Sequence, residues 1–155
     1  MKKAIIYLFL FTLSLSASSK TLDDIFSEFS KAPHAENINL RKFLFSALQI
    51  ANWDGKNFNK KVSSMSVLDL ESCSPDIKLQ FVEQIENLEM DGYEVLMKVK
   101  DDNDNVLIMS KSKKDKIKEL VIITVNDPAI IRLKGDFTPN DLSDITQQYG
   151  EKKKD

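Results

Sequence analysis

The stretch Tyr93-Glu94-Val95-Leu96-Met97-Lys98-Val99-Lys100 places apolar side chains largely at alternate positions, with charged residues between them. A period of two residues is typical of a β-strand with one buried face. Further apolar runs follow at residues 106–110, 120–125 and 129–133, and short polar segments separate them. Because short turns join antiparallel neighbours, this part of the chain predicts an antiparallel meander.

Towards the N-terminus the spacing of apolar residues changes to that of helices. Residues 61–71 still alternate in part and predict a strand. Ser74-Pro75 then supplies an N-cap followed by proline, and the segment up to Glu89 has one apolar side, which predicts an amphipathic helix. Two earlier segments also have helical spacing, one starting at Thr21 and one over residues 40–52, with a short extended link between them.

Thr138-Pro139-Asn140-Asp141 has the N-cap, proline and acidic start of a final helix, which Gly150 caps. The chain therefore predicts an α+β fold: two N-terminal helices, then strand, helix and strand, then the meander and the last helix. We expect a mostly antiparallel sheet of about five strands with the helices packed on one face. The strand–helix–strand order implies a parallel or near-parallel pair, and the face opposite the helices is expected to be half solvated.

The N-terminus has the organisation of an export signal. Met1-Lys2-Lys3 is basic, the run from Ala4 to Leu15 is almost wholly apolar, and residues 16–19 are small. The apolar run of about 12 residues is shorter than the roughly 20 that a membrane-spanning helix needs. We therefore expect residues 1–19 to be a secretory signal peptide rather than a membrane anchor.

Cleavage after Ser18 or Ser19 leaves residues 20–150 as one domain and 151–155 as a charged tail. It removes two lysines and no acidic residue, so the net charge changes from −2 to −4. The only cysteine, Cys73, lies far from the junction, so we expect no lipid attachment there. These features predict an exported, periplasmic protein with no integral membrane span after cleavage.

The composition excludes several classes of function. The 155 residues carry 22 Lys and Arg against 24 Asp and Glu, a balance that favours no nucleic-acid partner. One cysteine and one histidine, His34, leave no disulfide framework and few metal sites, and the four glycines are too far apart for a phosphate loop. We expect no cofactor, and Cys73 to be a partly buried hydrophobic residue; a Cys73–His34 dyad is a weaker alternative.

The densest basic run of the chain lies between two of the predicted meander strands. It gives a candidate basic surface at Lys111, Lys113, Lys114 and Lys116, with Lys118 close behind. Binding of anionic lipid or another polyanion is one hypothesis. The simpler interpretation is a solvated turn whose lysines protect a strand edge from pairing with other chains.

The C-terminal part resembles a known family. The segment Asp91–Leu96, the meander through residues 118–122, the segment Ile131–Phe137 and the closing helix together resemble the exported bacterial family known as domain of unknown function 4252, found mainly in Bacteroidetes. The motifs that carry the resemblance are the strand start Gly92-Tyr93-Glu94 and the turn Lys134-Gly135-Asp136. The resemblance implies a small envelope protein of unknown activity. It assigns no catalytic residues to this chain.

We interpret Gly92, Tyr93, Gly135 and Asp136 as structural residues of these motifs. Gly92 is expected to take a positive φ where a helix gives way to a strand, and Gly135 to do the same between the last strand and its helix. Tyr93 is expected to lie in the core or the sheet with its hydroxyl at the rim.

The sequence thus favours a non-catalytic interaction or sensing module of the envelope, with an envelope protein as partner, over an enzyme. The alternative is a periplasmic protein that binds a small ligand or lipid between sheet and helices. An apolar surface patch of several hundred Å² would favour the first hypothesis. An enclosed apolar cavity of about 300 Å³ or more would favour the second.

Overall fold

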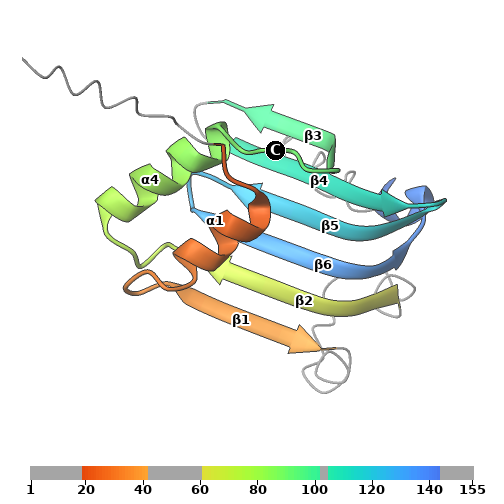
Figure 1. Ribbon diagram of the computed structural model, residues 1–155, viewed down its shortest axis with the longest axis horizontal. Coiled ribbons are helices and arrows are strands. Elements are labelled where there is room, and N and C mark those ends of the chain that lie inside the picture. The colour runs from red at the N-terminus through yellow and green to blue at the C-terminus, as the bar shows by residue number, and fades with distance from the viewer. Residues whose placement is uncertain (1–18, 42–60, 102–104, 144–155) are drawn as a thin grey trace, which may run out of the picture.

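The computed structural model describes residues 19–41, 61–101 and 105–143, which form one antiparallel sheet with helices packed against it (Figure 1). A further helix begins at residues 139–143 and packs on the face opposite the other two, so the expectation that all helices lie on one face is wrong. The named elements are, in chain order, α1 (Leu22–Phe29), β1 (Glu36–Arg41), β2 (Val62–Asp69), α4 (Pro75–Glu86), β3 (Glu94–Lys100), β4 (Asn105–Lys113), β5 (Lys116–Thr124) and β6 (Ala129–Phe137). The α+β class is therefore confirmed.

The sheet has the strand order β1-β2-β6-β5-β4-β3, and every neighbouring pair is antiparallel. The expected meander corresponds to β3 through β6. The sheet has six strands rather than about five, because the short extended link after the first helix is the edge strand β1. Leu40 and Arg41 belong to this strand and not to a helix. The rest of the helix predicted over residues 40–52 lies outside the described residues, as do residues 1–18 of the predicted signal peptide and the charged tail.

The expected parallel pair is not formed. β2 and β3 do run in the same direction, but β6, β5 and β4 lie between them. The lengths explain how the chain bypasses three strands: four interstrand spacings amount to about 19 Å. The 12 residues of α4 extend about 18 Å as a helix. α4 thus carries the chain across the sheet, and β6 pairs with β2 in the position expected for β3.

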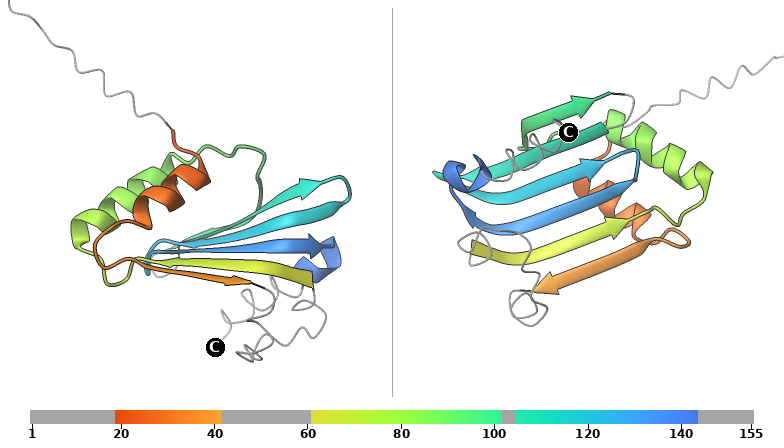
Figure 2. Two further views of the ribbon diagram at one scale, coloured as in Figure 1. Left: turned by 60° about the horizontal axis from the view of Figure 1, so that its bottom comes forward. Right: turned by 180° about the vertical axis from the view of Figure 1, so that it is seen from behind.

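Both named helices lie on the same face of the sheet (Figure 2). α1 begins with a capping box between Thr21 and Asp24, as its sequence predicts. α4 begins with Ser74 as N-cap and proline in its first turn. Phe29 of α1 packs edge-on against Phe81 of α4 with ring centroids 5.4 Å apart. These rings belong to a buried cluster that also includes Leu107, Met109, Val121, Ile123 and Ile130 of the sheet.

The opposite face of the sheet is also buried over its centre, so the expectation that it is half solvated is wrong there. Ile108, Ile122 and Leu133 point to this face and are at most 2% exposed. They form a second cluster with Phe137 and with Leu142 of the helix that follows β6. The uninterrupted apolar runs of β4 and β5 are typical of strands that are covered on both sides, whereas β3 at the edge of the sheet alternates.

The meander also has a tighter turn than expected. Lys111 to Lys113 belong to β4, and Lys116 already belongs to β5. The turn between these strands is therefore only Lys114 and Asp115, flanked by the directly paired residues Lys113 and Lys116.

Candidate functional site

α1 and α4 cover only one half of their face of the sheet (Figures 1 and 2). We call the half that these two helices leave uncovered, which ends at the turn between β4 and β5, the distal half. Register places Lys111, Glu119 and Lys134 side by side there, on neighbouring strands. Arg132 lies one step along the same face, opposite Ser66 and Val121. The floor of the distal half is therefore polar and rich in positive charge.

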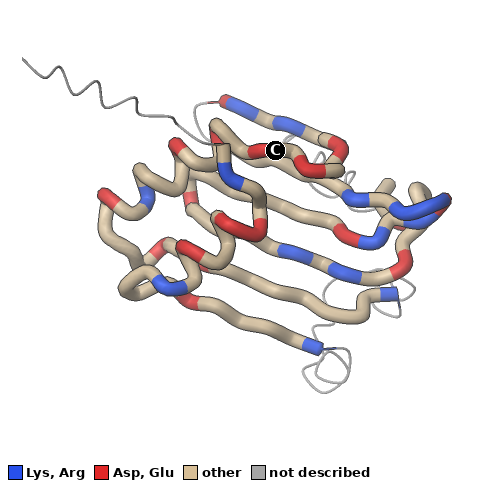
Figure 3. Tube along the Cα trace, viewed as in Figure 1, with Lys and Arg blue, Asp and Glu red and all other residues tan. Residues whose placement is uncertain are grey.

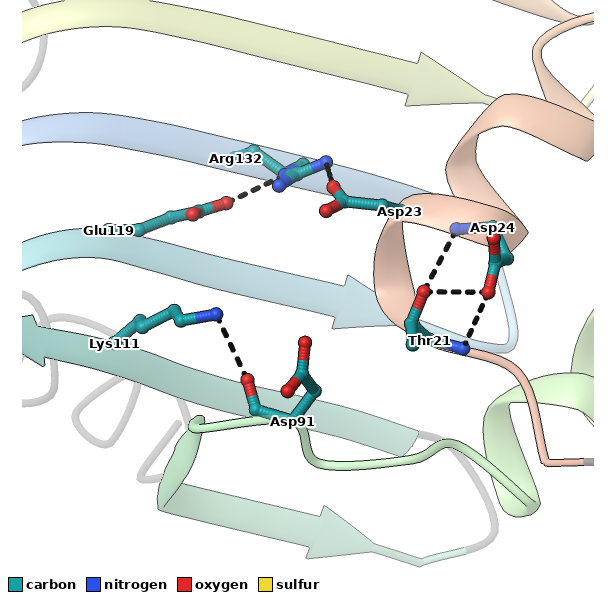
Figure 4. Close-up of polar contacts among 7 residues, drawn as sticks. All are labelled: Thr21, Asp23, Asp24, Asp91, Lys111, Glu119 and Arg132. Atoms are coloured by element: carbon teal, nitrogen blue, oxygen red, sulfur yellow. Dashed lines mark hydrogen bonds and ion pairs between the residues drawn. The ribbon is translucent and has the colours of Figure 1, made fainter.

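A partly buried ion network marks the border between the helices and the distal half (Figure 4). The Nε atom of Arg132 donates to Oε1 of Glu119 at 2.7 Å, and its Nη1 atom lies 2.7 Å from Oδ1 of Asp23 in α1. The side chains of Arg132 and Glu119 are 11% and 10% exposed, whereas that of Asp23 is 79% exposed. The guanidinium also lies over the ring of Phe26, 5.5 Å from its centroid. Arg132 thus ties α1 to β6 and β6 to β5.

The surroundings of Arg132 and Tyr93 keep both side chains in their ordinary charge states. Burial lowers the pKa of Arg132, but the hydrogen bond and charge of Glu119 raise it more, so the guanidinium stays protonated. Burial, followed by the carboxylate of Glu119, raises the pKa of Tyr93, so its phenol stays neutral. Lys111 donates from Nζ to the carbonyl oxygen of Asp91 at 3.0 Å (Figure 4). Its Nζ also lies 5.1 Å from the centroid of the Tyr93 ring. Lys111 is thus held by the segment before β3.

The other members of the candidate basic surface form a protruding group. Lys113, Lys114 and Lys116 are exposed, and among the described residues none of them is in an ion pair. Lys134 of β6 is exposed and likewise unpaired within these ranges. We call these four side chains the distal lysines. Figure 3 shows the blue of lysine and arginine gathered at this end of the sheet.

The turn between β4 and β5, which carries three of the four distal lysines, has two unfavourable features. Lys113 and Lys116 are directly opposite each other, and like charges in that position repel. Lys114 has a φ of +55°, in the left-handed region that favours glycine. An ordinary two-residue turn of this kind would carry glycine or asparagine rather than lysine.

The two motif glycines are required for different reasons. Gly92 has a φ of +78° in the turn before β3. Gly135 does not have a positive φ and does not lie between the last strand and its helix; it is inside β6, where a Cβ atom would be 2.2 Å from the carbonyl oxygen of Lys61. The close approach of two backbones, rather than a turn, explains this glycine. The neighbouring Asp136 forms an ion pair with Lys118.

A second ion pair fixes the start of the helix after β6. Nζ of Lys61 lies 2.7 Å from both carboxylate oxygens of Asp141, and Oδ2 of Asp141 accepts from the backbone N–H and hydroxyl of Thr138. Although burial raises the pKa of Asp141, these bonds lower it to about 2. The sequence identified Thr138 as the cap but gave no signal for Lys61, which is 80 residues away.

The opposite face has a groove of about 480 Å³ near the same turn. Its apolar lining includes Leu96, Ile117 and Leu142, and its polar lining includes Ser110, Ser112 and Lys114. The groove is open to solvent and mixed in character. It is therefore not the enclosed apolar cavity that would favour a buried ligand.

The remaining sequence candidates lie away from the distal half. Cys73 is 6% exposed, and burial raises the pKa of its thiol, which disfavours the reactive thiolate. His34 is exposed in the turn before β1, and no hydrogen bond or ion pair joins these two described residues. Within the described ranges, no three His, Cys, Asp or Glu side chains are grouped so that they could hold a metal ion. None of the helices in these ranges has the length and apolar character to cross a membrane.

Comparison with known proteins gives one result. No curated protein and no solved structure matches the chain significantly. The family model described as domain of unknown function (DUF4252) matches residues 29–145, which is more than half of the chain. The chain therefore belongs to the DUF4252 family.

Proposed function

We propose that this is an exported, periplasmic protein that acts as a non-catalytic interaction module, and that the distal lysines are its binding surface. The observation that carries the proposal is a contrast between two sets of charges. The buried groups Arg132 and Glu119 are paired with each other, whereas Lys113, Lys114 and Lys116 project without partners among the described residues. Buried charges that are paired with each other are satisfied within the fold, whereas exposed unpaired charges are available to a partner.

The charge of the described molecule is distributed unevenly along the sheet (Figure 3). Residues 111–118 contain five lysines and one acidic residue. α1 and α4 together contain six acidic residues and one lysine. A chain with a net charge of −2 thus presents a basic end, and an anionic partner is the complement to it.

A binding role also agrees with the state of the ionisable groups in the ion network. General acid–base chemistry needs a group whose pKa lies near the working pH. The pKa values of Tyr93 and Arg132 are both raised further away from neutrality. These features support binding as the function, with the network as its rigid base.

The groove of about 480 Å³ favours a second candidate, a periplasmic protein that binds a small amphipathic ligand. Leu96, Ile117 and Leu142 would contact an apolar part, and Lys114 an acidic group. Saturable binding of a radiolabelled fatty acid that is lost in Ile117→Asp but kept in Lys116→Gln would favour this candidate over the first.

The interaction surface can be tested by photo-crosslinking in producing cells. We would place a photoreactive amino acid at position 116 on the distal turn or, as a control, at position 79, where Leu79 is 60% exposed on α4. The proposal expects crosslinked products from position 116 that exceed those from position 79. Equal yields from the two positions, or products from position 79 alone, would contradict it.

Export is tested separately by cell fractionation and by the mass of the purified protein. We expect the protein in the periplasmic fraction, with a mass that corresponds to cleavage after Ser18 or Ser19. An uncleaved chain in the cytoplasm would contradict the proposed compartment without bearing on the interaction surface.

A further inference from the structure

We infer that the distal lysines dock the protein on an anionic phospholipid bilayer, with the turn between β4 and β5 facing the lipid headgroups. This inference rests on the proposed function, because it names the partner of the same surface. It is carried by three observations: the kind of residues in the surface, the shape of the turn, and the distance to the acidic helices.

The residues of the surface suit a field of headgroups better than a protein partner. Interfaces between proteins are depleted in lysine, and their strongest contacts come from Trp, Tyr and Arg. Lys113, Lys114 and Lys116 have no aromatic residue among or between them. Each lysine is a hydrated point charge on a flexible stem, which is attracted to many phosphates without a fixed geometry.

The shape of the turn brings the charges to one point. With only Lys114 and Asp115 between the strands, three lysines are gathered at the end of one hairpin. Lys113 faces Lys116 directly, and Lys114 has the left-handed backbone that glycine would take more easily. The turn thus departs from the most stable choice in two ways, and both departures add positive charge. An anionic surface would offset the repulsion between these lysines.

The length of the sheet separates the two signs of charge. The nine residues of β5 extend about 30 Å from the turn to the opposite end of the sheet. At physiological ionic strength the screening length is about 8 Å. Helix α4, which contains three acidic residues, lies over that opposite end, several screening lengths from a bilayer at the turn (Figure 1). Asp23, in α1, is already paired with Arg132. The net negative charge of the chain therefore does not prevent docking by this end.

The test is binding of the purified protein to vesicles. One set contains phosphatidylcholine alone and the other contains phosphatidylcholine with one third phosphatidylglycerol. For each variant we measure the ratio of its partition coefficient on the anionic vesicles to that on the phosphatidylcholine vesicles. Binding through an apolar segment contributes equally to both coefficients and therefore cancels in the ratio. The inference expects a ratio well above one at 0.05 M salt that falls towards one at 0.5 M salt.

Each lysine near an anionic surface increases partitioning about 5-fold, so the triple variant Lys113→Gln, Lys114→Gln, Lys116→Gln should lower the ratio by about 100-fold. The matched control is Lys31→Gln, Lys98→Gln, Lys100→Gln, which removes the same charge from exposed positions away from the distal turn. The control should change the ratio less than 3-fold. Far-UV circular dichroism establishes that both variants are folded.

Lys114→Gly provides a variant that keeps the turn geometry. It should lower the ratio about 5-fold, because it removes one charge while supplying the residue that the backbone conformation favours. A wild-type ratio near one, or equal losses in the triple and control variants, would overturn the docking inference. If the ratio is near one but position 116 still crosslinks to a protein, the bilayer is wrong as partner and the interaction module stands. If position 116 gives no crosslinked product above the control and the partition ratio is near one, the proposed interaction surface is wrong as well.

Discussion

Replacing Arg132 with methionine tests whether the ion network stabilises the contact of α1 with the sheet and the pairing of β5 with β6. Methionine retains an unbranched apolar stem that can contact the ring of Phe26, but it leaves the carboxylate of Glu119 without its cation. Glu119 is 10% exposed, so water cannot fully replace the lost bond. The side chain of Asp23, by contrast, is 79% exposed, so removing the guanidinium from this ion pair costs little stability.

The size of the effect follows from these exposures. Removing one partner of a buried ion pair costs about 3–5 kcal/mol, and the residual exposure of both side chains places this site near 3 kcal/mol. The loss of the exposed contact with Asp23 adds less than about 1 kcal/mol. For a chain of this length, 3 kcal/mol corresponds to a fall in melting temperature of roughly 6–12 °C.

The assay is urea unfolding followed by far-UV circular dichroism on four variants: Arg132→Met, Glu119→Gln, the double variant and Asp23→Asn. Glutamine keeps the size of Glu119 without its charge, so the double variant should recover about 2 kcal/mol relative to the sum of the single ones. Asp23→Asn should cost less than about 1 kcal/mol. Strict additivity of the two single changes, or a cost for Asp23→Asn equal to that of Arg132→Met, would refute this account of the network.

Three further predictions concern stability. Gly135→Ala should cost about 3 kcal/mol in urea unfolding, because the added Cβ meets the backbone oxygen of Lys61 at 2.2 Å; an unchanged midpoint would disprove the close approach. The pKa of Asp141 is lowered to about 2, so the contribution of its carboxylate to the free energy of unfolding is complete above about pH 4. That contribution is lost as the pH falls from about 4 to about 2. Wild type should therefore exceed Asp141→Asn by about 2 kcal/mol at pH 6 and by almost nothing at pH 2, and a pH-independent difference would contradict the assignment. Lys114→Gly should raise stability by about 0.5–1 kcal/mol, since glycine takes a φ of +55° without strain, and a lower urea midpoint would show that the turn is not strained.

The local sequence patterns predicted the elements that depend on neighbouring residues. The capping box at Thr21, the Ser74-Pro75 helix start and the alternation in β3 each involve groups within a few positions of one another. The antiparallel meander followed from turn lengths alone. β1 was predicted only as an extended link. Ile38 and Leu40 do alternate with polar residues, but two apolar residues are too few to indicate a strand, and the pairing of β1 with β2 is not local.

The site depends on relationships that one sequence does not contain. Glu119 and Arg132 are 13 positions apart and meet only because the β5–β6 register, with its bulge after Ile117, brings them together. One signal was present: Arg132 directly follows the apolar run Ala129–Ile131 in β6, and a charge beside a buried run needs a partner. Similarly, the continuous apolar runs of β4 and β5 contained the evidence that both faces of the sheet are covered.

The position of β6 has a consequence for how the molecule folds. It is the last strand of the described residues, yet it lies between β2 and β5 and pairs with both. β1 and β2 are synthesised first, but they join the other strands only through residues 129–137. The local contacts of β3, β4 and β5 can form early, while the pairing of β2 with β6 must close a long loop. Completion of the sheet is thus coupled to synthesis of β6, and a ribosome that still holds this strand keeps β1 and β2 from joining the sheet.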